Sequence, residues 1–241
     1  MRRFAILSAT ALLVAGCAGT QQPGATSGTD AARNLRVAAA AERGGQLDVA
    51  LSLYAAASEA SPGDPEVASR HAAALLQAGE PQRALDALAE ARRRHPSNQV
   101  LLQAEARARL EVGEPERALA LFDEHLRTTP SDARSLNGRG IALDLLGRHA
   151  EARLAYRAAR TADPRNPVST GNLALSLMLS GCPEAAMALL EAAPRNASTT
   201  TWLGQMQGLA RSLTPGGATD PQAVSLRGVL PPAAEPCPAM G

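Results

Sequence analysis

Cysteine and histidine are the residues of this 241-residue chain whose side chains most readily serve as nucleophiles or metal ligands. The three cysteines form no Cys-x-x-Cys pair, which is the usual arrangement of a dithiol redox site. The four histidines form neither a His-Glu-x-x-His motif nor a pair four residues apart. A glycine-rich phosphate loop and a Gly-x-Ser-x-Gly elbow are also absent from the sequence. The sequence therefore predicts a protein that is not an enzyme, with no catalytic residue, no metal, no cofactor and no small-molecule substrate.

The chemistry open to Cys17 depends on the residues before it. Arg2 and Arg3 precede an uncharged stretch, 4–16, and a basic segment followed by an apolar one is typical of a secretory signal. The stretch is shorter than the roughly 20 apolar residues of a transmembrane helix. The sequence Leu-Val-Ala-Gly-Cys at 13–17 resembles the lipobox of bacterial lipoproteins. An ordinary signal peptide that merely contains a cysteine is the alternative.

The lipobox resemblance implies that residues 1–16 are removed as a signal peptide and that the thiol of Cys17 accepts lipid, including acyl chains such as palmitate. Two or more acyl chains hold a protein stably in a membrane. Ala18 stands where an aspartate would favour retention in the inner membrane of enteric bacteria. We therefore expect a lipid anchor in the bacterial outer membrane, facing the periplasm, and a flexible tether over residues 17–30.

Cys182 and Cys237 remain once Cys17 is lipidated. Disulfides form in an oxidising compartment such as the bacterial periplasm, so these two cysteines are candidates for a disulfide. Two unpaired thiols are the alternative. Residues 214–241 are rich in proline and glycine without periodicity, which is typical of a disordered tail. A disulfide would hold this tail against the folded part of the chain.

A period of 34 residues runs through the chain and defines the elements that would position any site. Five glycines mark it: Gly45, Gly79, Gly113, Gly147 and Gly181. An alanine stands five residues after each glycine, and a large apolar residue stands nine residues after it. Glycine ends helices in a left-handed conformation, and a small residue lets two helices cross closely. The pattern therefore predicts one helix hairpin in every unit.

These landmarks resemble the tetratricopeptide repeat (TPR), a helix–turn–helix unit of the same length. The resemblance implies an all-α solenoid of about five repeats over 31–200, followed by a capping helix over 201–213 with Trp202 in its core. The expected repeats cover 31–64, 65–98, 99–132, 133–166 and 167–200. Pro194 falls inside the last repeat and predicts that its second helix is shortened. Abundant alanine and an aromatic content of 2% favour close-packed helices over a β-sandwich.

In TPR proteins the first helices of successive repeats line a concave groove that binds peptides or partner helices. The resemblance implies that repeats one and two offer small residues with Arg36 and Arg70 there, whereas repeats three to five offer an apolar strip with a polar rim. The expected partner-binding residues are Arg107, Leu110, Arg134, Asn137, Ile141, Asn172, Leu175 and Met178. Such a strip suits a helix or an extended peptide. Packing of these apolar residues between repeats is the alternative.

The formal net charge of +1 provides no basic field for nucleic acid, so a protein partner is expected. The segment 136–190, which begins Leu-Asn-Gly-Arg-Gly-Ile-Ala-Leu-Asp-Leu-Leu-Gly, resembles the TPR lipoproteins of tight-adherence (Flp) pilus assembly. This resemblance implies a scaffold that helps to assemble or localise the secretin through which the pilus passes. The alternatives are an adaptor that recruits cell-wall hydrolases or assists outer-membrane protein biogenesis and, remotely, an enzyme.

Overall fold

The structure is a computed structural model that describes residues 26–193, 200–214 and Cys237. These residues form eleven helices and no strand. Their bounds are α1 (Thr26–Arg43), α2 (Leu47–Ala60), α3 (Pro65–Gln77), α4 (Pro81–Arg94), α5 (Gln99–Glu111), α6 (Pro115–Thr128), α7 (Ala133–Leu145), α8 (His149–Ala162), α9 (Pro167–Leu179), α10 (Pro183–Glu191) and α11 (Thr200–Leu213). None of these described helices is both long enough and apolar enough to span a bilayer. The fold is all-α, as the sequence predicts.

Glycine turns explain why the sequence repeats every 34 residues. The five periodic glycines have φ between 72° and 77°, the left-handed region that residues with a Cβ rarely adopt. At the first turn the N–H of Gly45 donates to the carbonyl of Glu42, and the N–H of Gln46 donates to the carbonyl of Ala41. This pair of bonds ends a helix by satisfying its last carbonyl groups. Each hairpin therefore turns at a glycine because of its backbone conformation.

Small residues bring the two helices of each hairpin close together. The alanines five residues after each turn glycine are fully buried, and the large residues nine after it are nearly so. The first helix of the fourth hairpin, α7, carries two glycines where its neighbours approach most closely. A Cβ on Gly138 would lie 2.3 Å from the ring of Phe122. A Cβ on Gly140 would lie 2.4 Å from the ring of Tyr156. The two rings therefore fill the space that the glycines leave on either side of α7.

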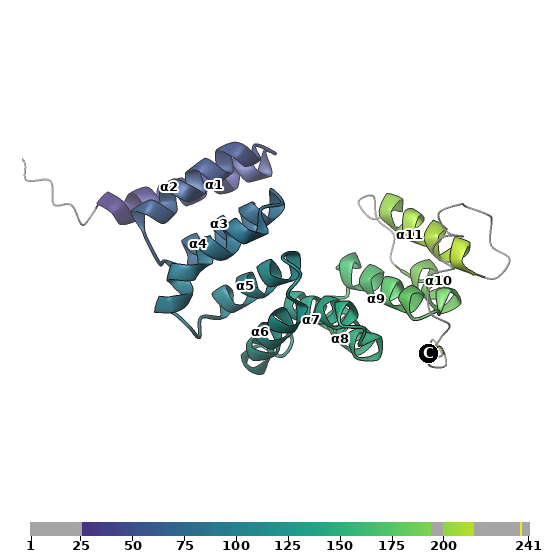
Figure 1. The fold of residues 1–241 in the computed structure, drawn as a ribbon. Helices are drawn as coiled ribbons and strands as arrows, with labels where there is room; N and C mark the ends of the chain where they lie inside the picture. The colour runs from purple at the N-terminus through teal and green to yellow at the C-terminus, as the bar shows by residue number, and fades with distance from the viewer. Residues whose placement is uncertain (1–25, 194–199, 215–236, 238–241) are drawn as a thin grey trace, which may run out of the picture.

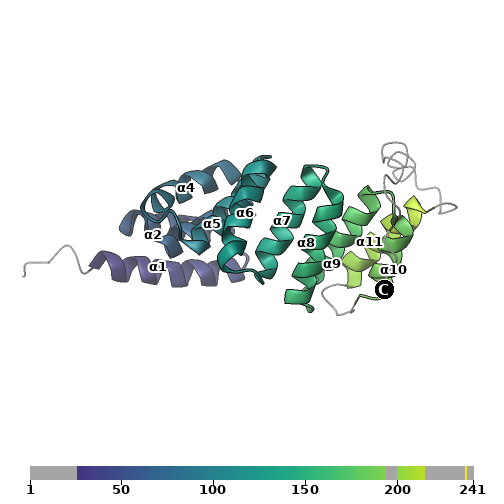
Figure 2. The same ribbon diagram turned by 90° about the horizontal axis from the view of Figure 1, so that it is seen from below.

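The hairpins stack in sequence order into an elongated molecule, with α1 and α11 at opposite ends (Figure 1). The odd-numbered helices contact each other in series from α1 to α11, and each even-numbered helix packs between its two neighbours in the chain. Figure 2 shows this succession plainly for α7, α8 and α9. We call the surface formed by the odd-numbered helices the inner face. Helix α11 continues this series after the fifth hairpin.

At the ends of the repeats, the start of α1 differs from the expected bound and the end of α10 agrees with it. Helix α1 begins at Thr26, so the last five residues of the segment 17–30, predicted to be a flexible tether, are helical. Extension of an existing helix needs no new nucleus, so it proceeds through a sequence of modest propensity. Helix α10 has 9 residues and ends at Glu191, which confirms the shortening predicted from Pro194. The capping helix expected over 201–213 corresponds to α11.

Candidate protein-binding surface

Helices α5, α7 and α9 carry the residues that the sequence predicts to bind a partner. Arg107 on α5 and Arg134 on α7 are exposed, and Leu175 on α9 is 41% exposed. Four others are half-buried: Leu110, Asn137, Ile141 and Asn172. Leu110 and Ile141 also pack against the core beneath them. The structure therefore brings most of the predicted residues to the inner face, although they differ in how much of each side chain a partner can reach.

Met178 contradicts the expectation of a solvent-exposed groove residue. Its side chain is 2% exposed and belongs to the core that also contains Ala210 and Leu213 of α11. Helix α11 contacts α9 and occupies the place where a further repeat would stack. The equivalent residue one repeat earlier, Asp144, has a side chain that is only 12% exposed, so this position faces the next helix of the series and not the solvent. Met178 is a core residue that joins the fifth repeat to α11.

The accessible part of the predicted strip is a small apolar patch on α7 and α9. Ile141 and Leu175 occupy equivalent positions, 34 residues apart, on two helices that contact each other. One turn earlier on the same helices, Asn172 donates a hydrogen bond of 3.0 Å from Nδ2 to the Oδ1 of Asn137. Leu145, which is 60% exposed, follows Ile141 by one turn on α7. We call Ile141, Leu145 and Leu175 the apolar patch; the asparagine pair borders it.

A polar cluster around Asp144 lies next to this patch. The Oδ1 of Asp144 accepts a hydrogen bond of 2.8 Å from the hydroxyl of Ser176 and lies 2.8 Å from the Nδ1 of His149. Its Oδ2 accepts a hydrogen bond of 3.0 Å from the hydroxyl of Tyr156. Burial, and secondarily the nearby carboxylate, raise the pKa of Tyr156 well above its ordinary value. Both carboxylate oxygens are thus occupied in holding α7, α8 and α9 together.

Nothing in the described part of the chain suggests a metal centre. No group of three or more histidine, cysteine, aspartate or glutamate side chains there is arranged to hold an ion. Every buried side-chain nitrogen and oxygen atom among those residues also has a hydrogen-bond partner.

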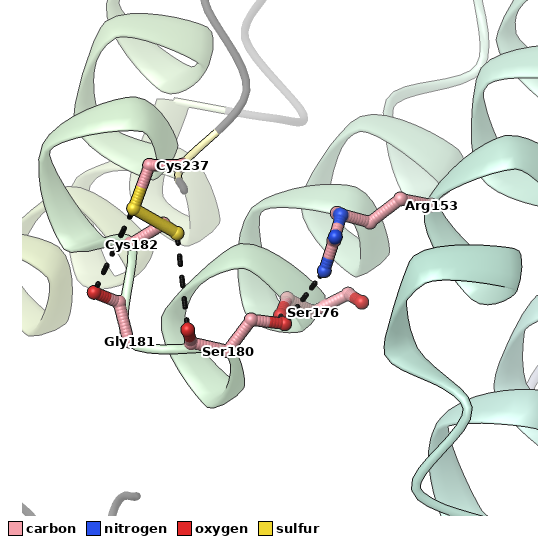
Figure 3. Close-up of a disulfide and its surroundings, with 6 residues drawn as sticks. All are labelled: Arg153, Ser176, Ser180, Gly181, Cys182 and Cys237. Carbon is pink, nitrogen blue, oxygen red and sulfur yellow. Dashed lines mark hydrogen bonds between the residues drawn. A yellow bond between two sulfur atoms is a disulfide. The ribbon is translucent and has the colours of Figure 1, made fainter. Parts of the chain in front are cut away.

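A disulfide joins Cys182 to Cys237, with the two Cα atoms 5.5 Å apart (Figure 3). Cys182 is the residue before α10 and is 2% exposed, whereas Cys237 is exposed. The two sulfur atoms lie 3.8 and 3.9 Å from the carbonyl oxygens of Ser180 and Gly181. Close to this turn, Arg153 of α8 donates a hydrogen bond of 2.8 Å to the hydroxyl of Ser180. The disulfide thus fixes Cys237 at the turn between α9 and α10.

Three sequence predictions fall on residues that the structure does not describe. They concern the signal peptide over 1–16 with lipidation of Cys17 and the tether up to residue 25, the disordered tail over 214–241 apart from Thr214 and Cys237, and the packing of the Trp202 side chain. Each of them stays a prediction.

A pocket at the other end of the inner face was not predicted. It has a volume of about 570 Å³ and lies between α1 and α3. Its lining residues are Ala32, Leu35, Arg36, Ala39, Arg43, Glu66 and Arg70. The sequence carried a signal for it, because Arg36 and Arg70 stand 34 residues apart at equivalent positions of repeats one and two. The larger apolar side chains of repeats three to five are a stronger signal for a binding surface, so the sequence alone does not predict this pocket.

Comparison with known proteins shows which proteins this architecture is similar to. Residues 104–167 match the family model described as a tetratricopeptide repeat. A thermophilic TPR protein of Thermus thermophilus is 23% identical, with a TM-score of 0.66 over 75% of this chain and 98% of that one. MamA from Desulfovibrio magneticus is 18% identical, with a TM-score of 0.57 over 74% and 97% of the two chains. No curated protein matches by sequence.

A chain from the Cut9–Hcn1 hetero-tetramer of the APC/C is also similar in structure. It is 16% identical and has a TM-score of 0.66 over 75% of this chain and 36% of that one. At these identities the similarities concern the fold. The described helices and the match over 104–167 together show that this chain has the fold of tetratricopeptide repeat proteins.

Proposed function

We propose that this protein is an outer-membrane-anchored scaffold that binds a partner protein on its inner face. The observation that carries the proposal is the apolar patch on α7 and α9, in which Leu145 and Leu175 are 60% and 41% exposed. Large apolar side chains that remain accessible beside polar groups are characteristic of surfaces that bind other proteins. The TPR fold supports this proposal, because its usual role is protein interaction rather than catalysis.

The asparagine pair gives the patch a feature that suits a peptide. Its hydrogen bond uses one donor of Asn172 and one lone pair of Asn137, and each amide has further donors and acceptors to offer. Both asparagines are half-buried, so these groups are partly accessible. A bound segment can therefore place apolar side chains on the patch while its backbone makes hydrogen bonds with the two amides. This combination fixes orientation as well as providing burial.

The finer proposal is a TadD-like role in assembly of the tight-adherence (Flp) pilus, with the secretin as partner. It is supported by the resemblance of residues 136–190 to the lipoproteins of that system and by the lipobox that ends at Cys17. A lipid anchor would keep the inner face in the periplasm beside the secretin. Ala18 after the cysteine favours the outer membrane, where a secretin forms its channel.

Secretin assembly in cells tests this role. We expect that deletion of the gene reduces heat-resistant secretin multimers in the outer-membrane fraction at least severalfold, and that the wild-type gene restores them. The variant Cys17→Ser should be made and folded but should fail to restore the multimers, because it cannot receive lipid. Secretin multimers at wild-type levels in the deletion strain would contradict the pilus role. Altered cell-wall hydrolysis in that strain would instead favour an adaptor of hydrolases.

A further inference from the structure

The pocket between α1 and α3 carries an excess of positive charge that no residue in the described part of the chain neutralises. Arg36, Arg43 and Arg70 line it together with a single carboxylate, that of Glu66. Arg36 and Arg43 are exposed, and neither guanidinium has an ion-pair or hydrogen-bond partner among the described residues. Arg70 is held by Glu66, with 2.5 Å between its Nε and Oε1. Two of the three guanidinium groups are therefore available to a ligand.

The sequence of α1 arranges these arginines around an open floor. Arg36 and Arg43 are seven residues apart, so they lie on the same side of the helix and about 10.5 Å apart along its axis. Ala32 and Ala39 also line the pocket and leave room beside the arginine side chains. Leu35 adds an apolar surface. The result is a cavity whose floor consists of small and apolar side chains, with charged groups spread along its length.

We propose that this pocket binds the acidic side chains of an extended segment of a partner protein. Guanidinium groups match carboxylates with paired, parallel hydrogen bonds. One small anion cannot reach two guanidinium groups two helical turns apart as well as a segment with several carboxylates can. In an extended chain, carboxylates on alternate residues lie about 6.8 Å apart on one side, so three of them cover the length of the pocket. The alanine floor then accommodates the backbone of that segment.

The parts of this chain outside the described structure do not provide such a segment. Residues 1–25, 194–199 and 238–241 contain no acidic residue, and 215–236 contain only Asp220 and Glu235, which are fifteen residues apart. Charge complementarity therefore favours an acidic segment of another protein. The proposal rests on the proposed function only in taking the partner to be a protein that lies along the inner face. It does not depend on that partner being a secretin.

Glu66 makes the proposal specific, because its carboxylate already occupies Arg70. The hydrogen bond to Glu66 raises the pKa of Arg70, which shows how closely the two groups interact. An incoming carboxylate must compete with Glu66 for this guanidinium. Removal of the charge at Glu66 should therefore improve binding of an acidic segment, whereas removal of charge at Arg36 and Arg43 should weaken it.

Binding of a synthetic peptide tests the proposal with the full-length protein in a neutral detergent. The probe is a fluorescent peptide with blocked ends and glutamates at alternate positions, separated by glycine and serine, and its anisotropy reports binding. We expect Arg36→Gln/Arg43→Gln to raise Kd at least tenfold and Glu66→Gln to lower it severalfold. Arg127→Gln/Arg157→Gln, which removes two exposed arginines of α6 and α8, is the matched control and should leave Kd unchanged.

Several outcomes would overturn the proposal. They are no binding by the wild-type protein, an equal loss in the control variant, and weaker binding by Glu66→Gln. Displacement of the peptide by inorganic phosphate at the same concentration as by unlabelled peptide would also overturn it, since that would indicate a site for one small anion. Self-association that the double variant abolishes would replace the partner with a second copy of this chain. The peptide contains neither apolar residues nor secretin sequence, so its failure to bind would not affect the proposed pilus role.

Discussion

His71 on α3 is the histidine whose surroundings most directly link stability to pH. Its Nδ1 lies 3.1 Å from the hydroxyl of Ser58, and its ring is half-buried. Burial, and secondarily the positive charge of Arg83, lower the pKa of His71 below its ordinary value of 6.5. The unfolded chain therefore binds a proton at a higher pH than the folded one does. Folding is favoured by the neutral ring.

This shift predicts that His71 destabilises the protein in mild acid. Its contribution is fully present above the unfolded pKa of 6.5 and is lost as pH falls from there towards the lower folded pKa. We expect the free energy of unfolding, measured in urea between pH 7.5 and 5, to fall less steeply in His71→Gln than in the wild type. Identical pH slopes for the two proteins would show that another group causes the acid sensitivity.

Other residues show which properties of a single side chain can be predicted from the sequence. The period of 34 correctly placed Ile141 and Leu175 at equivalent positions on α7 and α9, because a repeat fixes which side of a helix a residue occupies. The same reasoning placed Met178 wrongly, since its position faces the next helix of the series, here α11, as Asp144 does one repeat earlier. The pocket at Arg36 and Arg70 was missed because small floor residues give a weaker signal in the sequence than large apolar ones do.

At the scale of elements, most helix bounds follow from local signals that the sequence displays. Turn glycines end the first helix of each hairpin, and proline begins α3, α4, α6, α9 and α10. The start of α1 does not follow from such a signal, since Thr26–Asp30 reads as a linker and is helical only as an extension of α1. Composition indicates whether a segment is helical on its own, whereas a segment that continues an existing helix becomes helical despite its composition.

The disulfide closes a loop around the last two helices of the described structure. Cys182 and Cys237 are 55 residues apart and enclose α10 and α11. Terminal units of a solenoid contact a neighbour on one side only, so they unfold most readily. By constraining the unfolded loop, the disulfide stabilises this end by roughly 4 kcal/mol on the chain-entropy model.

Hydrogen exchange measures that contribution directly. In Cys237→Ser we expect amide protection in α10 and α11 to fall by up to roughly 4 kcal/mol of opening free energy, while α3 and α4 keep theirs. Reduction of the wild-type protein should have the same effect, which controls for the substitution itself. Unchanged protection of α10 and α11 in both samples would mean that the disulfide does not hold this end of the molecule.

The whole molecule presents one inner face with two chemically different ends. The end formed by α1 and α3 carries arginines above an alanine floor, and the end formed by α7 and α9 carries the apolar patch. A partner with an acidic part and an apolar part would match both ends at once. The stacking of similar hairpins makes this possible, because each odd-numbered helix presents the same positions with different side chains.

The central claim is tested most directly by the affinity of the purified protein for the periplasmic region of the secretin, its proposed partner, together with a thermal melt of each variant. Leu175→Ser removes an exposed member of the apolar patch, and Leu154→Ser removes a leucine of α8 that is 63% exposed and outside the inner face. We expect Leu175→Ser to weaken binding by about 2 kcal/mol, the scale of a hot spot, with little change in melting temperature. Leu154→Ser should bind as the wild type does. Undiminished binding by a well-folded Leu175→Ser protein, or an equal loss in Leu154→Ser, would contradict the claim that the inner face holds the partner.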